Sequence, residues 1–265
     1  MHAFNYNRAG SVKDAQALLG KASDGRFLAG GQSLVQAMKL RLASPSDLVD
    51  LGAIKELSGI KVSGATVEIG AMTRHAEVAA SSDVKKTIPA LAALAGSIGD
   101  RQVRAMGTLG GSLAHNDPAA DYPAAVLGLG ATVITSKRKI EADKFFKGLY
   151  ETALEPGEII TAVSFPAPKR AAYAKFKNPA SRFAIAGVFV ADTGKGVRVA
   201  VTGAGPVVFR VPEMEKALGA KFAPESVAGV KVKAEGLNTD LHASAEYRAH
   251  LISVMAKRAV EAALK

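Results

Sequence analysis

Two glycine-rich motifs limit what this 265-residue chain can fold into more than any other feature. The first lies between a predicted strand and a predicted helix, and Gly30 in it stands 80 residues before Gly110 in the second. Glycine lets the backbone turn with a positive φ, and free amides at the start of a helix suit phosphate oxygens. We therefore predict two glycine turns that hold a diphosphate from both sides. Their residues are Ala29, Gly30, Gly31, Gln32, Ser33 and Leu34, and Thr108, Leu109, Gly110, Gly111, Ser112 and Leu113.

Neither motif defines a ligand by itself. Neither matches the G-x-G-x-x-G fingerprint of dinucleotide-binding folds, and neither ends in the lysine of a P-loop. A glycine pair before a helix is also an ordinary tight connection, so each motif alone has a purely structural explanation.

The first 55 residues read as a small β-α-β unit. We expect a strand at 26–29, a helix at 34–42 with Leu34, Met38 and Leu42 at helical spacing, and a strand at 48–51. A helix at 11–20 precedes this unit, because Ser11 and Asp14 resemble a capping box.

The rest of the chain divides near 166–170, where Pro166 and Pro168 interrupt the pattern. Before this point, glycine-bounded alternation at 59–64 and 66–70 predicts a β meander. Further expected elements there are helices at 73–80, 89–97 and 119–128, a hairpin at 131–135 and 138–141, and a strand at 159–165. After it we expect strands at 172–176, 184–191 and 197–203 and helices at 212–218 and 244–264.

Positive charge is concentrated after this boundary. Residues 1–165 contain 18 Lys and Arg against 16 Asp and Glu, whereas residues 166–265 contain 16 against 8. This excess is either a basic face for an acidic partner or a plain solvated surface. The basic residues are scattered without aromatic interleaving, which disfavours nucleic-acid binding as the main role.

Several classes of protein are excluded or disfavoured by residue usage. The chain has no Cys, which excludes disulfides, a thiol nucleophile and Cys-ligated iron–sulfur clusters in this chain. Its five histidines show no metal-ligand spacing, and its serines lie in no G-x-S-x-G elbow. No apolar run is long enough for a membrane span and the N-terminus is not a secretory signal, so we expect a cytoplasmic protein.

Asp121 follows a predicted loop at 115–118. Its carboxylate could accept hydrogen bonds from a ligand hydroxyl. A carboxylate at a helix N-terminus is also favourable through the helix dipole alone, so both explanations stay open.

Taken together, five segments resemble the FAD-binding flavoproteins of the molybdenum hydroxylases. These are the medium subunits of aerobic carbon monoxide dehydrogenase and the FAD domain of xanthine dehydrogenase. The resemblance covers essentially the whole chain. It rests on F-x-Y-x-R-A-x-S-V-x-D-A at 4–15, AGGQSL at 29–34, MKLRLASPSDLVDL at 38–51, IGDRQVRAMGTLGGSLAHNDPAADYPA at 98–124 and AYAKFKNPASRFAIAGVFV at 172–190.

The resemblance implies an α+β fold. Residues 1–167 would form a FAD-binding domain of the vanillyl-alcohol-oxidase (PCMH) type, with subdomains at about 1–55 and 56–167. Residues 168–265 would form a small α+β domain with an antiparallel sheet.

The resemblance also implies the roles of individual residues. Residues 29–33 and 108–112 would hold the diphosphate and ribityl chain of FAD, and Leu34 would complete the first loop. Asp121 would lie near the ribityl chain or the flavin. Ile98 and Ile160 would make apolar contacts and Lys175 a basic contact with the cofactor. Gln32 and Ser112 depart from the residues common in the family, which leaves the flavin-side contacts open.

The implied function is electron transfer within a larger complex. A small subunit would carry two [2Fe–2S] clusters and a large subunit the molybdopterin, assembled as a dimer of heterotrimers. Electrons would pass through this FAD to an external acceptor. Two alternatives are a stand-alone FAD-dependent oxidase or reductase of the same fold, and an interaction protein that has lost FAD, which the intact glycines disfavour.

Overall fold

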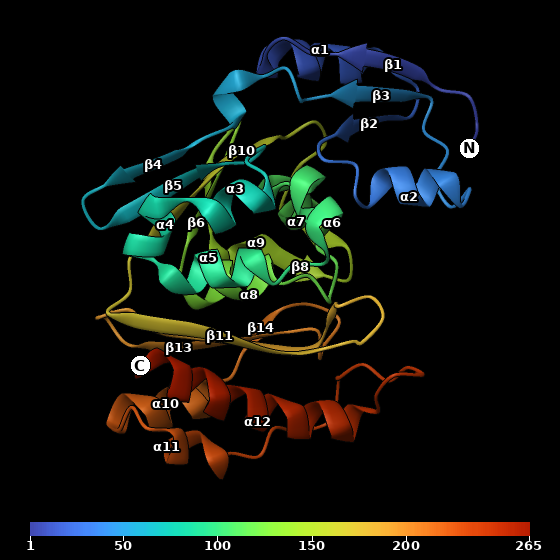
Figure 1. Ribbon diagram of the computed structural model, residues 1–265. Coiled ribbons are helices and arrows are strands. Elements are labelled where there is room, and N and C mark those ends of the chain that lie inside the picture. Colours follow the sequence, from blue (N-terminus) through green and yellow to red (C-terminus); the bar gives the residue numbers. More distant parts are fainter.

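The first fifty residues build a three-stranded parallel sheet. The computed structural model describes residues 1–265, and this sheet lies at one end of the molecule (Figure 1). Its order is β1-β3-β2, with parallel pairing throughout, so the predicted β-α-β unit is confirmed. The elements are β1 (Asn5–Arg8), α1 (Val12–Lys21), β2 (Gly25–Leu28), α2 (Leu34–Lys39) and β3 (Asp47–Asp50).

The helix expected at 34–42 ends earlier than predicted. α2 stops at Lys39, and Arg41 adopts the left-handed conformation with φ 61°. The N–H of Leu42 then donates to the carbonyl of Ala37 at 2.8 Å, which closes a Schellman-type C-terminus. Leu42 is 79% exposed, so the apolar spacing that suggested another turn of helix does not mark a buried face.

The second unit is a five-stranded antiparallel sheet covered by helices. Its order is β4-β5-β10-β6-β7, and β10, the strand predicted at 159–165, lies at its centre. The strands are β4 (Ile60–Ser63), β5 (Thr66–Gly70), β6 (Thr132–Thr135), β7 (Lys139–Glu141) and β10 (Ile160–Pro166), with a small hairpin of β8 (Phe146–Gly148) and β9 (Glu151–Thr152). The helices are α3 (His75–Ala80), α4 (Ser82–Thr87), α5 (Pro89–Gly96), α6 (Arg101–Met106), α7 (Leu109–His115), α8 (Tyr122–Gly128) and α9 (Ala142–Phe145), preceded by the 3₁₀ turn η1 (Lys55–Leu57).

The third unit is a four-stranded antiparallel sheet with three helices on its outer face (Figure 1). Side chains of a strand alternate between the two faces of a sheet. Phe189 therefore joins the core of the second unit, whereas Val188 and Val190 pack against the C-terminal helices. The elements are β11 (Arg170–Lys177), β12 (Ala184–Asp192), β13 (Val197–Thr202), β14 (Phe209–Arg210), α10 (Pro212–Ala220), α11 (Pro224–Ala228) and α12 (Ala245–Ala263).

The architecture is thus the α+β arrangement that the sequence predicts, with an antiparallel sheet in its C-terminal part. None of its helices has both the length and the apolar character that crossing a bilayer requires.

Candidate cofactor site

A cavity of about 660 Å³ lies where the three units meet. This volume is within the usual range of roughly 300–1,000 Å³ for small-molecule and cofactor sites. Lys175 does not line it, and Leu109 and Leu113 of the second motif are buried in the core of the second unit instead. The other residues predicted for the site all line it: Ala29, Gly30, Gly31, Gln32, Ser33, Leu34, Ile98, Thr108, Gly110, Gly111, Ser112, Asp121 and Ile160.

The first glycine motif lines this cavity and contains a row of unpaired amides. It connects the end of β2 to the start of α2, and Gly31 in it has φ +71°. No backbone N–H from Gly30 to Leu34 donates to an acceptor within the protein. Consecutive free amides at such a turn suit an anion such as a phosphate group, which is the ligand that the sequence predicts.

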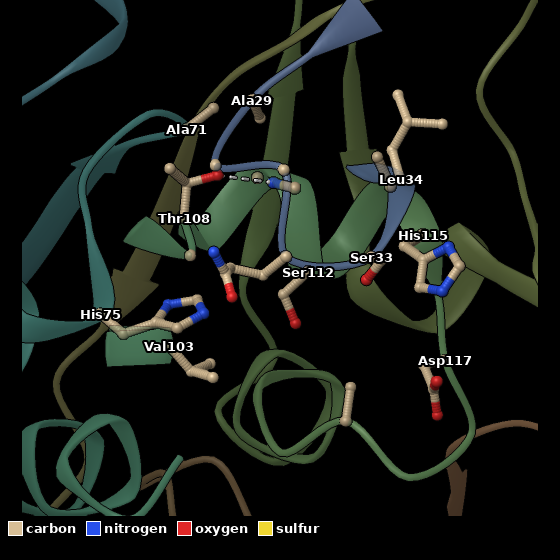
Figure 2. A pocket seen from close by; sticks show the side chains of 18 of the residues that line it. Ala29, Ser33, Leu34, Ala71, His75, Val103, Thr108, Ser112, His115 and Asp117 are labelled. Carbon is tan, nitrogen blue, oxygen red and sulfur yellow. Dashed lines mark hydrogen bonds between the residues drawn. The ribbon is translucent and has the colours of Figure 1, made fainter. Parts of the chain in front are cut away.

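The second motif differs from the prediction of a matching turn with bare amides. Gly110 and Gly111 lie in the first turn of α7, with Thr108 as its N-cap. Their amides are already used: Gly110 donates to the carbonyl of Ala71 at 2.7 Å and Gly111 to the Thr108 hydroxyl at 3.2 Å. Polar contacts from this motif to a ligand are left mainly to the Ser112 hydroxyl, which points into the cavity in Figure 2.

The glycines also allow two distant segments to touch. A Cβ at Gly30 would lie 2.0 Å from the carbonyl oxygen of Met106. A Cβ at Gly111 would lie 3.3 Å from the Cβ of Ala29, and one at Gly110 would lie 2.5 Å from the Cβ of Ala71. Larger residues would therefore push the first motif away from the segment that leads into α7.

Asp121 lies in the cavity wall but its carboxylate is held by the third unit. The Lys175 ammonium lies 3.0 Å from it, and the Tyr173 hydroxyl donates to Oδ1 at 2.5 Å. Burial raises the pKa of the Asp121 carboxyl, and these two partners act in the opposite direction. Lys175 also donates hydrogen bonds to the carbonyls of Ser97 and Arg182. It therefore affects the cavity only by holding residues of the cavity wall.

Glu158, a lining residue not predicted from the sequence, is fixed as an anion. Burial would raise its pKa, but hydrogen bonds from Arg138, Thr135 and the Glu155 amide outweigh this and lower the pKa to about 2. A carboxylate so held cannot act as a base near neutral pH.

Two family matches together span nearly all of the chain. The family described as the FAD binding domain in molybdopterin dehydrogenase matches residues 2–168, and the CO dehydrogenase flavoprotein C-terminal domain matches residues 171–263. The chain belongs to the molybdenum hydroxylase FAD-subunit family. In Paenarthrobacter nicotinovorans, the nicotine 6-hydroxylase medium subunit is 38% identical, covering 97% of this chain and 96% of that one.

Other members of the molybdenum hydroxylase FAD-subunit family are equally well covered. The carbon monoxide dehydrogenase medium chain of Hydrogenophaga pseudoflava is 37% identical over 98% of this chain and 96% of its own length. A solved structure of carbon monoxide dehydrogenase from that organism, lacking the Mo-pyranopterin moiety, superposes with a TM-score of 0.90 at 37% identity. It covers 99% of this chain and 98% of that one.

The residues present fit the FAD that defines this family. The unpaired amides at 30–34 suit a diphosphate, and the missing Cβ atoms of the glycines let the two motifs pack close together in the cavity wall. The remaining wall is largely apolar, with Met72, Ile98 and Val103 available to flat rings. The cavity therefore has both a polar strip for the diphosphate and apolar surface for the ring systems.

His75 was not predicted from the sequence, although it lines the cavity and is only 5% exposed. Burial, with Arg104 as a smaller second cause, lowers its pKa to about 4. Its only sequence signal is a lone histidine five residues after the β meander, with no partner at metal-ligand or catalytic spacing.

Proposed function

We propose that this chain binds FAD in the cavity and serves as the electron-transfer subunit of a multi-subunit molybdenum hydroxylase. The row of unpaired amides at 30–34 on a 660 Å³ cavity, in a chain that the two family matches span almost entirely, is the observation that carries the proposal. FAD would supply the redox chemistry, and this chain would supply binding, orientation and electrostatics. We assign cofactor binding to residues 1–167 and partner docking to residues 168–265.

The carboxylates of the cavity support a relay role over a stand-alone oxidase. Glu158 is held by Arg138 and Thr135, and Asp121 is held by Lys175 and Tyr173. Asp117 accepts a hydrogen bond from the Ala119 amide at 2.8 Å. A stand-alone oxidase that used Glu158 or Asp121 as its acid or base would need that carboxylate free, whereas a subunit that passes electrons does not.

The complex that we propose contains three kinds of subunit. A small subunit would carry [2Fe–2S] clusters and a large subunit the molybdopterin, in two copies each with this chain, in the cytoplasm. Relatives named as medium chains support the existence of other chains, and the absence of Cys here requires the clusters to lie elsewhere. An external acceptor would receive the electrons.

FAD binding is tested by titrating the purified chain with FAD and following flavin fluorescence. Ser33→Asp places a negative charge beside the unpaired amides at an exposed position, so it should repel the diphosphate and weaken binding at least tenfold. Ser63→Asp adds the same charge on β4 outside the cavity and should not change affinity. Equal affinity for both variants would place the diphosphate elsewhere.

The relay role is tested by purifying the tagged chain from its native cell and measuring bound metal. We expect iron, molybdenum and two further polypeptides to copurify. A metal-free flavoprotein that is active alone would instead establish the stand-alone oxidase.

A further inference from the structure

One edge of the His75 imidazole is buried, and the ring nitrogen on it lacks a hydrogen-bond partner. Nδ1 of His75 is sealed from solvent and has no hydrogen-bond partner. The nearest aromatic neighbour, Tyr122, lies 5.2 Å away between ring centroids, and its own hydroxyl is also buried without a partner. Nothing on this side of the imidazole accepts a proton from it.

The opposite edge of the ring faces the cavity. Nε2 lies against Gly107, where an added Cβ would come within 2.6 Å of it. In Figure 2 the imidazole points into the space bordered by Ser112 and Val103. The backbone fixes this placement, because the His75 amide donates to the Gly107 carbonyl at 2.9 Å and the Leu109 amide donates to Thr73 at 3.1 Å.

The two edges determine where the single proton of the neutral ring resides. A neutral imidazole has one N–H donor and one acceptor nitrogen, and its surroundings select the tautomer. A buried N–H without an acceptor is rarer in proteins than an under-used acceptor. The proton therefore belongs on Nε2, and Nδ1 is left as the unprotonated nitrogen. The depressed pKa agrees with a ring that stays neutral near pH 7.

We propose that His75 is a neutral Nε2–H donor to a ring heteroatom or ring carbonyl of the bound dinucleotide. The inference rests on the proposed function, since it takes FAD as the occupant of the cavity. Val103 lies beside the imidazole in Figure 2, and with Ile98 it contributes an apolar part of the cavity wall that suits a flat ring better than a phosphate. The diphosphate belongs with the amides of the first motif, so His75 contacts one of the two ring systems that flank it.

The first experiment observes the tautomer directly. The full chain is labelled with ¹⁵N-histidine, and His75→Gln identifies the His75 signals. We expect a protonated Nε2 and an unprotonated Nδ1 in the free protein near pH 7. Adding FAD should shift the Nε2–H proton downfield, because it acquires an acceptor. A proton on Nδ1, or a signal that FAD saturation leaves unmoved, would overturn the proposal.

The second experiment measures affinity in variants. His75→Leu removes the donor and should weaken FAD about three- to tenfold, as expected for one net hydrogen bond. His75→Gln keeps a donor at similar reach and should recover most of the affinity. Tyr122→Phe removes a buried hydroxyl that does not line the cavity and should bind FAD like the wild type. Circular dichroism establishes that each variant is folded.

Titrations with ADP and FMN distinguish the two ring systems. If His75→Leu binds ADP more weakly than the wild type but binds FMN equally well, the contact is with the adenine. If it binds FMN more weakly and ADP equally well, the contact is with the flavin. Equal FAD affinity in His75→Leu and the wild type would overturn the contact while the proposed function stands. Failure of the wild type and of its native assembly to bind FAD would overturn the proposed function itself, whichever tautomer is found.

Discussion

Lys175 and Asp121 form a buried ion pair at 3.0 Å, although 54 residues separate them in sequence. Lys175 lies on β11 of the third unit, and Asp121 is the N-cap residue of α8 in the second. Both side chains are about 5% exposed or less. The pair fixes a residue of the cavity wall from outside the unit that forms most of the cavity.

Removing one partner of this pair should be costly. Lys175→Met leaves the Asp121 carboxylate buried and unpaired, which costs roughly 3–5 kcal/mol in the free energy of unfolding. Urea unfolding measures the loss. Lys177→Met on the same strand removes an exposed lysine and should cost under about 0.5 kcal/mol. Adding Asp121→Asn to Lys175→Met should recover part of the loss, and a further loss would contradict this account.

Gly30→Ala should destabilise the contact between the first motif and the segment before α7. Its Cβ would lie 2.0 Å from a backbone oxygen that cannot rotate away, so we expect a cost of about 1–3 kcal/mol or more together with weaker FAD binding. Gly20→Ala is the matched control, because nothing lies within 4 Å of its added Cβ. It should be neutral or stabilise α1 by up to about 1 kcal/mol. Thermal unfolding measures the stability of both variants. An equal change in Tm for the two would refute the packing argument.

Acid should destabilise the protein through His75. The folded-state pKa is about 4 and the ordinary value is 6.5, so the unfolded chain takes up this proton first as the pH falls. Stability that is complete above pH 6.5 is therefore lost towards pH 4, by up to roughly 3 kcal/mol. The difference in unfolding free energy between the wild type and His75→Gln should be constant above pH 7 and shift against the wild type below 6.5. A difference independent of pH would contradict the prediction.

Arg248 should be essential to the third unit. Its guanidinium is 4% exposed, donates to the carbonyls of Ile185 and Gly203 at 2.7 and 2.9 Å, and pairs with Asp240 at 2.7 Å. Lysine cannot reproduce this planar fork, so Arg248→Lys should cost roughly 2–4 kcal/mol in urea unfolding. Arg258→Lys on the exposed face of the same helix should change little. Comparable losses in both would show that the fork is unimportant.

Reversing exposed charge tests whether residues 168–265 dock a partner. Lys216, Lys221, Lys231 and Lys233 are exposed and form no ion pair in this chain. Changing all four to Glu should reduce copurification of the iron–sulfur and molybdopterin subunits at low salt. The control reverses four exposed lysines of the first two units, Lys13, Lys61, Lys85 and Lys86. Unchanged assembly in the first variant would reject the docking surface.

The sequence predicts helices and strands well where the apolar periodicity and the breaks at Gly or Pro agree. Three strands of the third unit, β11, β12 and β13, are long and end at Pro, Gly or polar residues, so they were predicted within two residues, whereas the two-residue strand β14 was not predicted. α4 and α6 were missed because neither has an apolar face: α4 buries only Val84, and α6 buries no residue. α2 was predicted too long because Arg41, a residue with no preference for a left-handed cap, ends it.

The predicted site residues were brought together by packing that no local pattern encodes. The amides of the first motif are unpaired, whereas Gly110 and Gly111 serve helix packing and their amides are occupied. Lys175 was assigned to the cofactor by resemblance, but it acts on the wall residue Asp121. The role of His75 depends on which of its ring edges is sealed, and that is decided by Tyr122 and Gly107 from distant parts of the chain.

The placement of β12 has a mechanical consequence. Phe189 is packed on one side against α8, whose Gly128 lies so close that a Cβ would come within 2.8 Å of the ring, and Val190 on the other side contacts the outer helices. Large apolar interfaces suppress the relative motion otherwise expected between domains. A subunit docked on the outer helices would therefore stay at a constant distance from the cavity. Electron transfer between them would not require a movement of one domain relative to another.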